Sequence, residues 1–228
     1  MRDIAQLEKT IKVRFTDKQL LLTALTHRSY LNENREQAEH NERLEFLGDA
    51  VLELATTEYL FHTLPDKPEG ELTSLRAALV RKENLDKVAQ SLQLGEYLRL
   101  SKGEDAGGGR TNAYILANTV EALIGAIYLD HTYKTAKKFI ETFVLPELPR
   151  IIENSLHRDA KSYLQELAQE RVKVTPSYDI ISESGPDHDK TFIAGVFFAG
   201  EEQGRGEGRS KQSAELKAAE DALKKLKW

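Results

Sequence analysis

Three carboxylates recur at helical spacing near residue 45 of the 228-residue chain. Placed on an α-helix at about 100° per residue, Glu42, Glu45 and Asp49 fall within a sector of roughly 60°. Like charges at this spacing repel one another, and a divalent cation such as Mg²⁺, which prefers oxygen ligands, would relieve the repulsion. A plain solvated acidic stripe is the alternative. The stripe alone therefore indicates either a metal site or an exposed helix face.

A second segment, residues 114–130, supplies matching groups and favours the metal site. It reads YILANTVEALIGAIYLD, a long apolar helix in which Glu121 is an ionisable group among aliphatic residues. A carboxylate with such neighbours is unfavourable unless it is paired or bound to a metal ion. Asn118 lies about one helical turn earlier on the same side. Two such helices facing each other would place three carboxylates and one amide oxygen around one or two Mg²⁺ ions.

Three stretches resemble sequences of the ribonuclease III family. HNERLEFLGDAVLE at 40–53 is similar to the family signature, LANTVEALIGAIYLD at 116–130 to its second acidic motif, and LTALTHRSY at 22–30 to its N-terminal helix. The tail resembles a double-stranded-RNA-binding domain. The resemblance spans essentially the whole chain. It implies a Mg²⁺-dependent endoribonuclease (with Mn²⁺ as a substitute) that cuts double-stranded RNA, leaves two-nucleotide 3′ overhangs, and processes rRNA precursors and mRNA.

The resemblance also assigns roles to individual acidic residues. The implied metal ligands are Glu45, Asp49, Asn118 and Glu121. The implied catalytic residues are Asp49, Glu121, Glu42 and Glu69. Two of these have simpler interpretations, because Glu42 could cap or hydrogen-bond at the start of its helix and Glu69 could be a surface residue in a turn.

A homodimer formed through the endonuclease domain is also implied, with two cleavage centres acting on opposing strands. An isologous interface is consistent with that two-fold symmetry. Phe46 lies opposite the apolar face of the 42–52 helix and is a candidate interface residue. Packing within its own domain is the alternative.

Asn118 departs from the family pattern, in which aspartate is usual. An amide can donate its oxygen to a metal or orient a water, but it carries no charge, so the affinity for a hard cation should fall. Three interpretations stay open: an active natural variant that needs more Mg²⁺, a naturally weakened enzyme, or an engineered substitution that traps substrate. The rival function is a non-cleaving double-stranded-RNA-binding protein. A DNA nuclease is disfavoured because the tail resembles a reader of A-form RNA.

Composition narrows the class of protein further. A chain in which 40% of the residues are hydrophobic can form one large or two modest domains. We expect no membrane partner, because there is no run of about 18 apolar residues. The absence of cysteine excludes disulfides and thiolate zinc sites and suits a cytoplasmic protein. The net charge of −5 argues weakly against nucleic-acid binding, although bound cations would offset part of the acidic cluster.

From residue 4 to about residue 145 the hydrophobic pattern is almost wholly helical. PDKPEG at 65–70 interrupts it, and helical periodicity returns over 72–94. Residues 101–111 contain four glycines and little apolar content, which predicts a mobile loop. That loop would either let the backbone approach RNA or serve as a plain connection. Pro146 and Pro149 are expected to close the helical unit.

The pattern changes after residue 158. Helices are predicted over 159–169 and 210–226, and strands over 177–184, 191–199 and, more weakly, 202–208. This order fits a small sheet with both helices on one face. The predicted fold is an all-α N-terminal endonuclease domain, residues 1–152, a linker, 153–158, and a small α+β (α-β-β-β-α) double-stranded-RNA-binding domain, 159–228.

The implied RNA contacts lie at three places in that second domain. They are Gln165 and Glu166 on the first helix, His188 in the loop after the first strand, and Arg209, Ser210, Lys211 and Gln212 at the start of the last helix. A-form RNA is read through minor-groove contacts and phosphates, and a helix N-terminus favours phosphate. Taken alone, His188 could be a plain loop residue and Lys211 a solvated one. Gln212 and Glu215 stand where basic residues are usual, which predicts weaker, more salt-sensitive binding.

Overall fold

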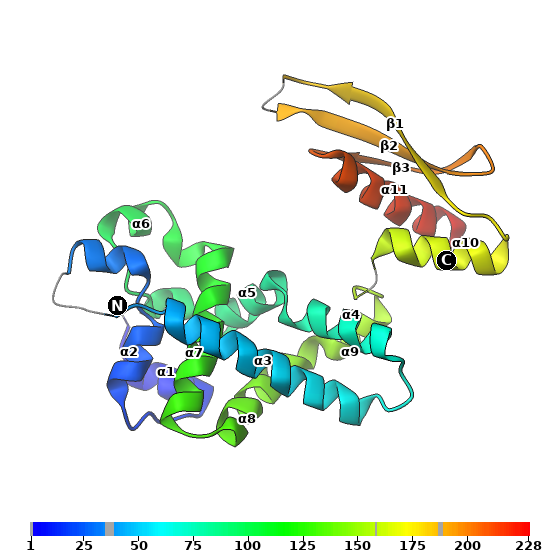
Figure 1. The fold of residues 1–228 in the computed structure, drawn as a ribbon. Helices are drawn as coiled ribbons and strands as arrows, with labels where there is room; N and C mark the ends of the chain where they lie inside the picture. Colours follow the sequence, from blue (N-terminus) through cyan, green and yellow to red (C-terminus); the bar gives the residue numbers. More distant parts are fainter. Residues whose placement is uncertain (1, 35–38, 158, 187–188) are drawn as a thin grey trace. The chain divides into compact units, whose positions relative to one another are not determined.

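The structure, a computed structural model, describes residues 2–34, 39–157, 159–186 and 189–228. These residues form two compact units, residues 1–157 and 158–228 (Figure 1). The first unit is helical, and the second combines a three-stranded sheet with two helices. The predicted fold class is therefore confirmed.

The first unit consists of packed α-helices joined by short 3₁₀ turns. In chain order these are α1 (Ile4–Ile11), α2 (Lys18–Ala24), η1 (Arg28–Asn32), α3 (Glu42–Thr63), α4 (Glu69–Val80), α5 (Lys82–Ser91), η2 (Leu94–Tyr97), α6 (Lys102–Ala106), η3 (Gly109–Thr111), α7 (Ala113–Asp130), α8 (Tyr133–Phe143), η4 (Leu145–Glu147) and α9 (Leu148–Glu153).

Helix α7 forms the centre of this unit. Eleven of its 18 residues are buried. Asn112 starts the helix, because its side-chain oxygen accepts a hydrogen bond from the Tyr114 amide at 2.9 Å. By length and composition alone α7 could cross a membrane, yet 61% of it is buried inside the protein. Its apolar composition is thus that of a core helix.

Helix α3 crosses α7 with the two backbones in direct contact (Figure 1). A Cβ atom added to Gly48 of α3 would lie 1.8 Å from the backbone oxygen of Glu121, and one added to Gly125 of α7 would lie 2.2 Å from the backbone oxygen of Leu44. Neither position has room for a side chain. The two glycines therefore fix how α3 is placed along α7, and with it the placement of the acidic residues on both helices.

Residues 101–111 do not form the mobile loop that the sequence predicts. They fold into α6 and η3. The Arg110 guanidinium donates to both carboxylate oxygens of Asp105, at 2.8 and 2.9 Å, and to the backbone carbonyls of Gly95 and Leu98, at 2.8 and 3.0 Å. Charge-assisted, bidentate hydrogen bonds of this kind fix a segment that has little apolar content. The loop prediction was wrong because composition carries no information about such pairing.

The prolines near residue 147 start short helices and do not end the helical unit. Pro146 lies in the first turn of η4 and Pro149 in the first turn of α9. Proline is tolerated there because the first N–H groups of a helix have no partner within the helix. Part of the predicted linker also belongs to the first unit, since Leu156 packs against its core and His157 is only 9% exposed.

The second unit contains α10 (Ala160–Arg171), β1 (Ser177–Ser184), β2 (Thr191–Phe198), β3 (Glu201–Gly208) and α11 (Lys211–Leu226). The strands form an antiparallel sheet in the order β1-β2-β3. Helix α11 packs against β2 and β3, and α10 packs against α11 (Figure 1).

Strand β3 looks weak in the sequence because it buries glycines. Gly204 and Gly206 point toward α11, and a Cβ atom at Gly206 would lie 2.2 Å from the Ala218 backbone nitrogen. Ala214, Ala218 and Ala222 of α11 are fully buried in this contact region. The helix backbone therefore lies directly on the strand, and small residues on both elements make that possible.

Gly48→Ala is expected to destabilise the first unit by about 1–3 kcal/mol, because an added methyl group has no space at the helix crossing. Urea unfolding followed by circular dichroism measures the loss. The matched control is Gly70→Ala, where a Cβ atom would meet nothing within 4 Å. Equal unfolding midpoints for the two variants would contradict the close contact of α3 and α7.

Candidate active site and nucleic-acid interface

The acidic side chains of α3 and α7 come together beside the crossing of the two helices. The Asn118 side chain lies near the Glu45 carboxylate and acts to lower its pKa. The charges of Asp49 and Glu45 both act on Glu121. Glu45, Asn118 and Glu121 are half-buried, whereas Asp49 is exposed. The four residues predicted as metal ligands thus lie in one region of the structure.

These carboxylates are electrostatically unfavourable as anions. Burial, followed by the charges of Asp49 and Glu45, raises the pKa of Glu121 from its ordinary 4.5 to about 7. Burial also raises the pKa of Glu45, and the charge of Glu42 adds to that effect. Both shifts have the direction expected for acids that are desolvated near like charges. Positive charge placed among them would lower both pKa values.

The donor atoms present fit a hard divalent cation. Carboxylate and amide oxygens are the ligands that Mg²⁺ prefers, and Mg²⁺ usually keeps several of its waters. Among the residues that the structure describes, no three His, Cys, Asp or Glu side chains converge closely enough to hold a metal ion by themselves. The fourth donor, Asn118, is an amide and adds an oxygen without adding charge.

The other two predicted catalytic residues have different partners. Glu42 is exposed, and its carboxylate lies 3.2 Å from Nη1 of Arg28 and 3.8 Å from Nδ1 of His40. It forms an ion pair with Arg28 and does not cap α3. Glu69 is the first residue of α4 and does not lie in a turn, and its Oε1 accepts a hydrogen bond from the Thr73 hydroxyl at 3.0 Å. Of the two, Glu42 is electrostatically coupled to the acidic set, through Glu45.

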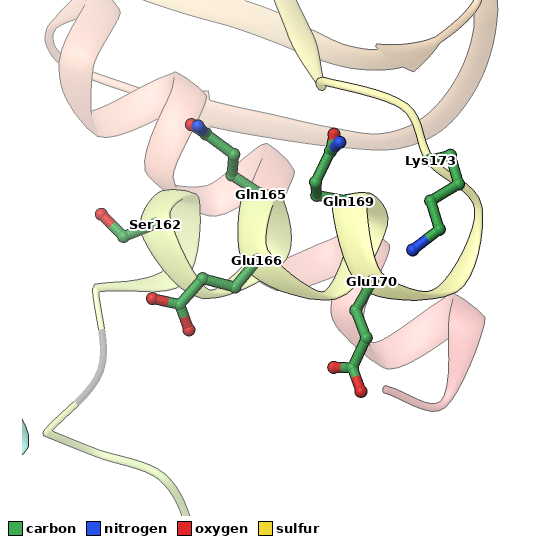
Figure 2. Close-up of a pocket in the computed structure, with 6 residues that line it drawn as sticks. All are labelled: Ser162, Gln165, Glu166, Gln169, Glu170 and Lys173. Carbon is green, nitrogen blue, oxygen red and sulfur yellow. The ribbon is translucent and has the colours of Figure 1, made fainter.

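In the second unit, one side of α10 is a polar surface. Figure 2 shows the side chains that line a depression here: Ser162, Gln165, Glu166, Gln169 and Glu170 from α10, and Lys173 from the segment that follows the helix. Gln165 and Glu166 are the two helix contacts predicted from the sequence, and both are exposed. The same surface continues for a further turn to Gln169 and then to Lys173, which follows the end of α10. Amides, hydroxyls and carboxylates can hydrogen-bond to 2′-hydroxyls, whereas phosphates require positive charge.

The predicted phosphate contacts lie at the start of α11. Arg209, Ser210, Lys211 and Gln212 are all exposed. The Ser210 hydroxyl accepts a hydrogen bond from the Ser213 amide at 3.1 Å and so caps the helix. Backbone N–H groups and the helix dipole favour an anion at this end of α11.

Glu215, whose charge we expect to weaken RNA binding, is paired within the domain. Lys161 of α10 donates a hydrogen bond to its carboxylate at 2.6 Å. The pair joins α10 to α11 and offsets the negative charge. Another predicted contact, His188, lies outside the described residues.

Comparison with known proteins finds a matching family for each of the two units. A family model described as Ribonuclease-III-like matches residues 17–148, and one for the double-stranded RNA binding motif matches residues 160–226. Ribonuclease 3 of Natranaerobius thermophilus is 51% identical over 225 residues, which cover 99% of this chain and 97% of that protein. The chain belongs to the ribonuclease III family.

Further relatives support the same family. Ribonuclease 3 of Enterococcus faecalis is 46% identical, and the match covers 97% of this chain and 96% of that protein. The nuclease domain of ribonuclease III from Campylobacter jejuni has a TM-score of 0.60 at 42% identity, covering 64% of this chain and 99% of that one. As a ribonuclease III family member the protein is an endoribonuclease, with a double-stranded RNA binding motif at its C-terminal end.

The structure of this ribonuclease III family member also shows whether Phe46 packs within its own domain. Its side chain is 82% exposed, so the interpretation that it packs within its own domain was wrong. Leu54 and Phe61 follow on α3 and are 57% and 65% exposed. On an α-helix these three residues fall within a sector of about 80°. Helix α3 therefore carries an exposed apolar stripe in addition to its acidic one.

Sequence reasoning did not identify the residues that position the site. Gly48 and Gly125 lie within the two motifs and make the helix contact. Each is a small residue within a predicted amphipathic or apolar helix, a pattern that suggests close backbone approach. Arg28 forms an ion pair with Glu42, and helical or strand periodicity does not predict a pair between residues this far apart in the chain.

Without a divalent cation, the stability of the folded protein is expected to fall as the pH rises from about 5 to about 8. The pKa of Glu121 in the folded state, about 7, lies above its ordinary 4.5, so the folded state binds this proton more tightly. That advantage is present at low pH and is lost as the pH rises through 7. The pKa difference corresponds to at most about 3 kcal/mol, which solvent screening of the partly exposed carboxylate reduces to about 1 kcal/mol.

Glu121→Gln should remove most of this pH dependence. Urea unfolding in EDTA at pH 5 and pH 8 measures it in both proteins. Glu69→Gln is the control, because Glu69 has a different partner. If the Glu121 variant keeps the full pH dependence, the electrostatic account of the site is wrong.

Proposed function

We propose that this protein is a Mg²⁺-dependent endoribonuclease of the cytoplasm that hydrolyses double-stranded RNA as a homodimer and leaves two-nucleotide 3′ overhangs. The observation that carries the proposal is the gathering of Glu45, Asp49, Asn118 and Glu121 at the α3–α7 crossing. In the same chain, the double-stranded RNA binding motif over residues 160–226 supplies a means of holding the substrate.

The four residues would have different roles as metal ligands at the phosphodiester bond. Asp49 and Glu121 would hold one or two Mg²⁺ ions, with Mn²⁺ as a substitute, and Glu45 and Asn118 would complete the oxygen ligands. The bound cation would supply charge neutralisation at the phosphoryl oxygens and activation of the attacking water. Asn118, which acts on the pKa of Glu45, would help to orient that carboxylate. Glu42 and Glu69 would act at the edge of the cleavage centre.

Dimerisation would use the exposed apolar stripe of α3. A side chain such as Phe46, 82% exposed, is unfavourable in water and suits an interface. A two-fold axis would place the same stripe of each subunit in the contact and provide two cleavage centres. One centre on each strand, offset across the minor groove, accounts for the overhangs.

The second unit would supply most of the affinity for RNA. The polar side of α10, with Gln165 and Glu166, suits 2′-hydroxyls in the minor groove, and the start of α11, with Lys211, suits phosphate. His188 would contact the neighbouring minor groove. Such contacts read the shape of the duplex, so any RNA with a long duplex can bind, and we propose rRNA precursors and mRNA duplexes as the substrates.

Cleavage of a long perfect RNA duplex across a Mg²⁺ titration tests this function. We expect short products with two-nucleotide 3′ overhangs, and none in EDTA. Asp49→Asn and Glu121→Gln should each lower the cleavage rate by at least about a hundredfold, more than is typical for residues that only orient a ligand. Duplex binding, measured by electrophoretic mobility shift, should persist in both variants. Binding without cleavage by the unaltered protein at any Mg²⁺ concentration would refute the proposal.

That last outcome would favour the alternative, a weakened or inactive double-stranded-RNA-binding protein. The observation behind this alternative is the neutral amide of Asn118 among the acidic residues. Asn118→Asp adds a charge to the ligand set, so the Mg²⁺ concentration for half-maximal cleavage should fall several-fold while the affinity for the duplex stays the same. If the variant needs as much Mg²⁺ as the unaltered protein, Asn118 is not a metal ligand.

A further inference from the structure

A positioned cation lies beside the acidic site and is not part of it. Lys82, the first residue of α5, places its Nζ atom 3.5 Å from the centroid of the Tyr114 ring. Tyr114 is the second residue of α7, and its side chain is 65% exposed. A cation over the face of an aromatic ring is attracted to the ring electrons. The ring therefore holds the ammonium in place at the surface of the first unit.

Tyr114 extends the side of α7 that carries the proposed ligands. At about 100° per residue, positions 114, 118, 121 and 125 fall within a sector of roughly 60°. Tyr114 precedes Asn118 by about 6 Å along the helix axis and Glu121 by about 10 Å, at about 1.5 Å per residue. The Lys82–Tyr114 pair thus lies along the line of the acidic site, toward the N-terminus of α7.

The charge of Lys82 is not offset by a carboxylate. In the described part of the chain, Lys82 makes no ion pair, and its ammonium instead contacts the ring of Tyr114. Lys87, on the same helix, differs because its Nζ lies 3.5 Å from the Glu147 carboxylate. An aromatic ring fixes an ammonium without neutralising it, so Lys82 retains a full positive charge for an anion.

The substrate of the neighbouring acidic site, an RNA strand, is an anion. The backbone phosphates of an RNA strand are repelled by Glu45, Asp49 and Glu121, and a fixed cation one to two helical turns away offsets part of that repulsion. The bases of a duplex are stacked and paired, which leaves phosphates and 2′-hydroxyls at its surface. A lysine ammonium binds phosphate as a point charge.

We propose that Lys82, held by Tyr114, binds a backbone phosphate of the RNA strand that enters the acidic site. This inference rests on the proposed function. It assigns to the first unit a substrate contact that is separate from the metal ligands and from the RNA-binding surfaces of the second unit.

The salt dependence of binding tests this contact. Binding of a perfect RNA duplex is measured in the full chain between about 50 and 200 mM salt at constant Mg²⁺, in a Glu121→Gln background that keeps the RNA intact. Lys82→Gln should weaken binding several-fold and reduce the slope of log K against log salt by about 1. Lys87→Gln, the matched control on α5, should leave the slope unchanged. Lys82→Arg should retain it.

The role of the ring is tested at Tyr114. Tyr114→Phe keeps an aromatic face and should bind the duplex as the unaltered protein does. Tyr114→Leu removes the face and should weaken binding about two- to fivefold, the effect of losing an exposed cation–π contact. In the cleavage-competent chain, Lys82→Gln should raise KM and leave kcat nearly unchanged, because a phosphate outside the reaction centre is held equally before and during the reaction.

The outcomes separate this inference from the function on which it rests. If the unaltered protein cleaves the duplex but Lys82→Gln matches Lys87→Gln in salt slope and KM, Lys82 does not contact phosphate and the inference is wrong. If the unaltered protein neither binds nor cleaves the duplex, the proposed function itself fails. Circular dichroism of each variant verifies that the fold is retained.

Discussion

The direct contact between the backbones of α3 and α7 is the constraint on which the acidic site depends. Helices that pack through side chains keep their axes about 8–10 Å apart. Here a Cβ atom at Gly48 would lie 1.8 Å from a backbone oxygen of α7, so the contact tolerates glycine and nothing larger. This close approach brings Asn118 near enough to Glu45 to act on its pKa, and it puts Glu121 within reach of the charge of Asp49.

The same contact concentrates negative charge at the edge of a hydrophobic core. Eleven buried residues of α7 hold the helix in place, and their burial outweighs the desolvation and like-charge repulsion that together raise the pKa of Glu121 to about 7. The site is therefore arranged to gain stability when a cation binds. Its substrate is also an anion, so cations are needed beyond the ligand set. Lys82, over the Tyr114 ring, and the exposed Lys211 at the start of α11 each provide positive charge.

Much of the fold and of the acidic set could be predicted from the sequence, because helical spacing is a local property. The positions of Glu45, Asp49 and Glu121 on two long helices follow from periodicity alone. Other features depend on partners far apart in the chain, and local patterns do not encode them. The hydrogen bonds of Arg110 hold residues 101–111 in a folded arrangement where the sequence predicts a loop. Similarly, Lys161 offsets the charge of Glu215.

The most direct test of this account is to locate a divalent cation in a crystal of the full chain grown with Mn²⁺, by anomalous scattering at the manganese edge. We predict a peak among the oxygens of Glu45, Asp49, Asn118 and Glu121 at the α3–α7 crossing, at distances of about 2.0–2.3 Å as hard cations require. A well-ordered site without a peak at saturating Mn²⁺, or a peak bound by other residues, would contradict the claim that this crossing builds the metal centre.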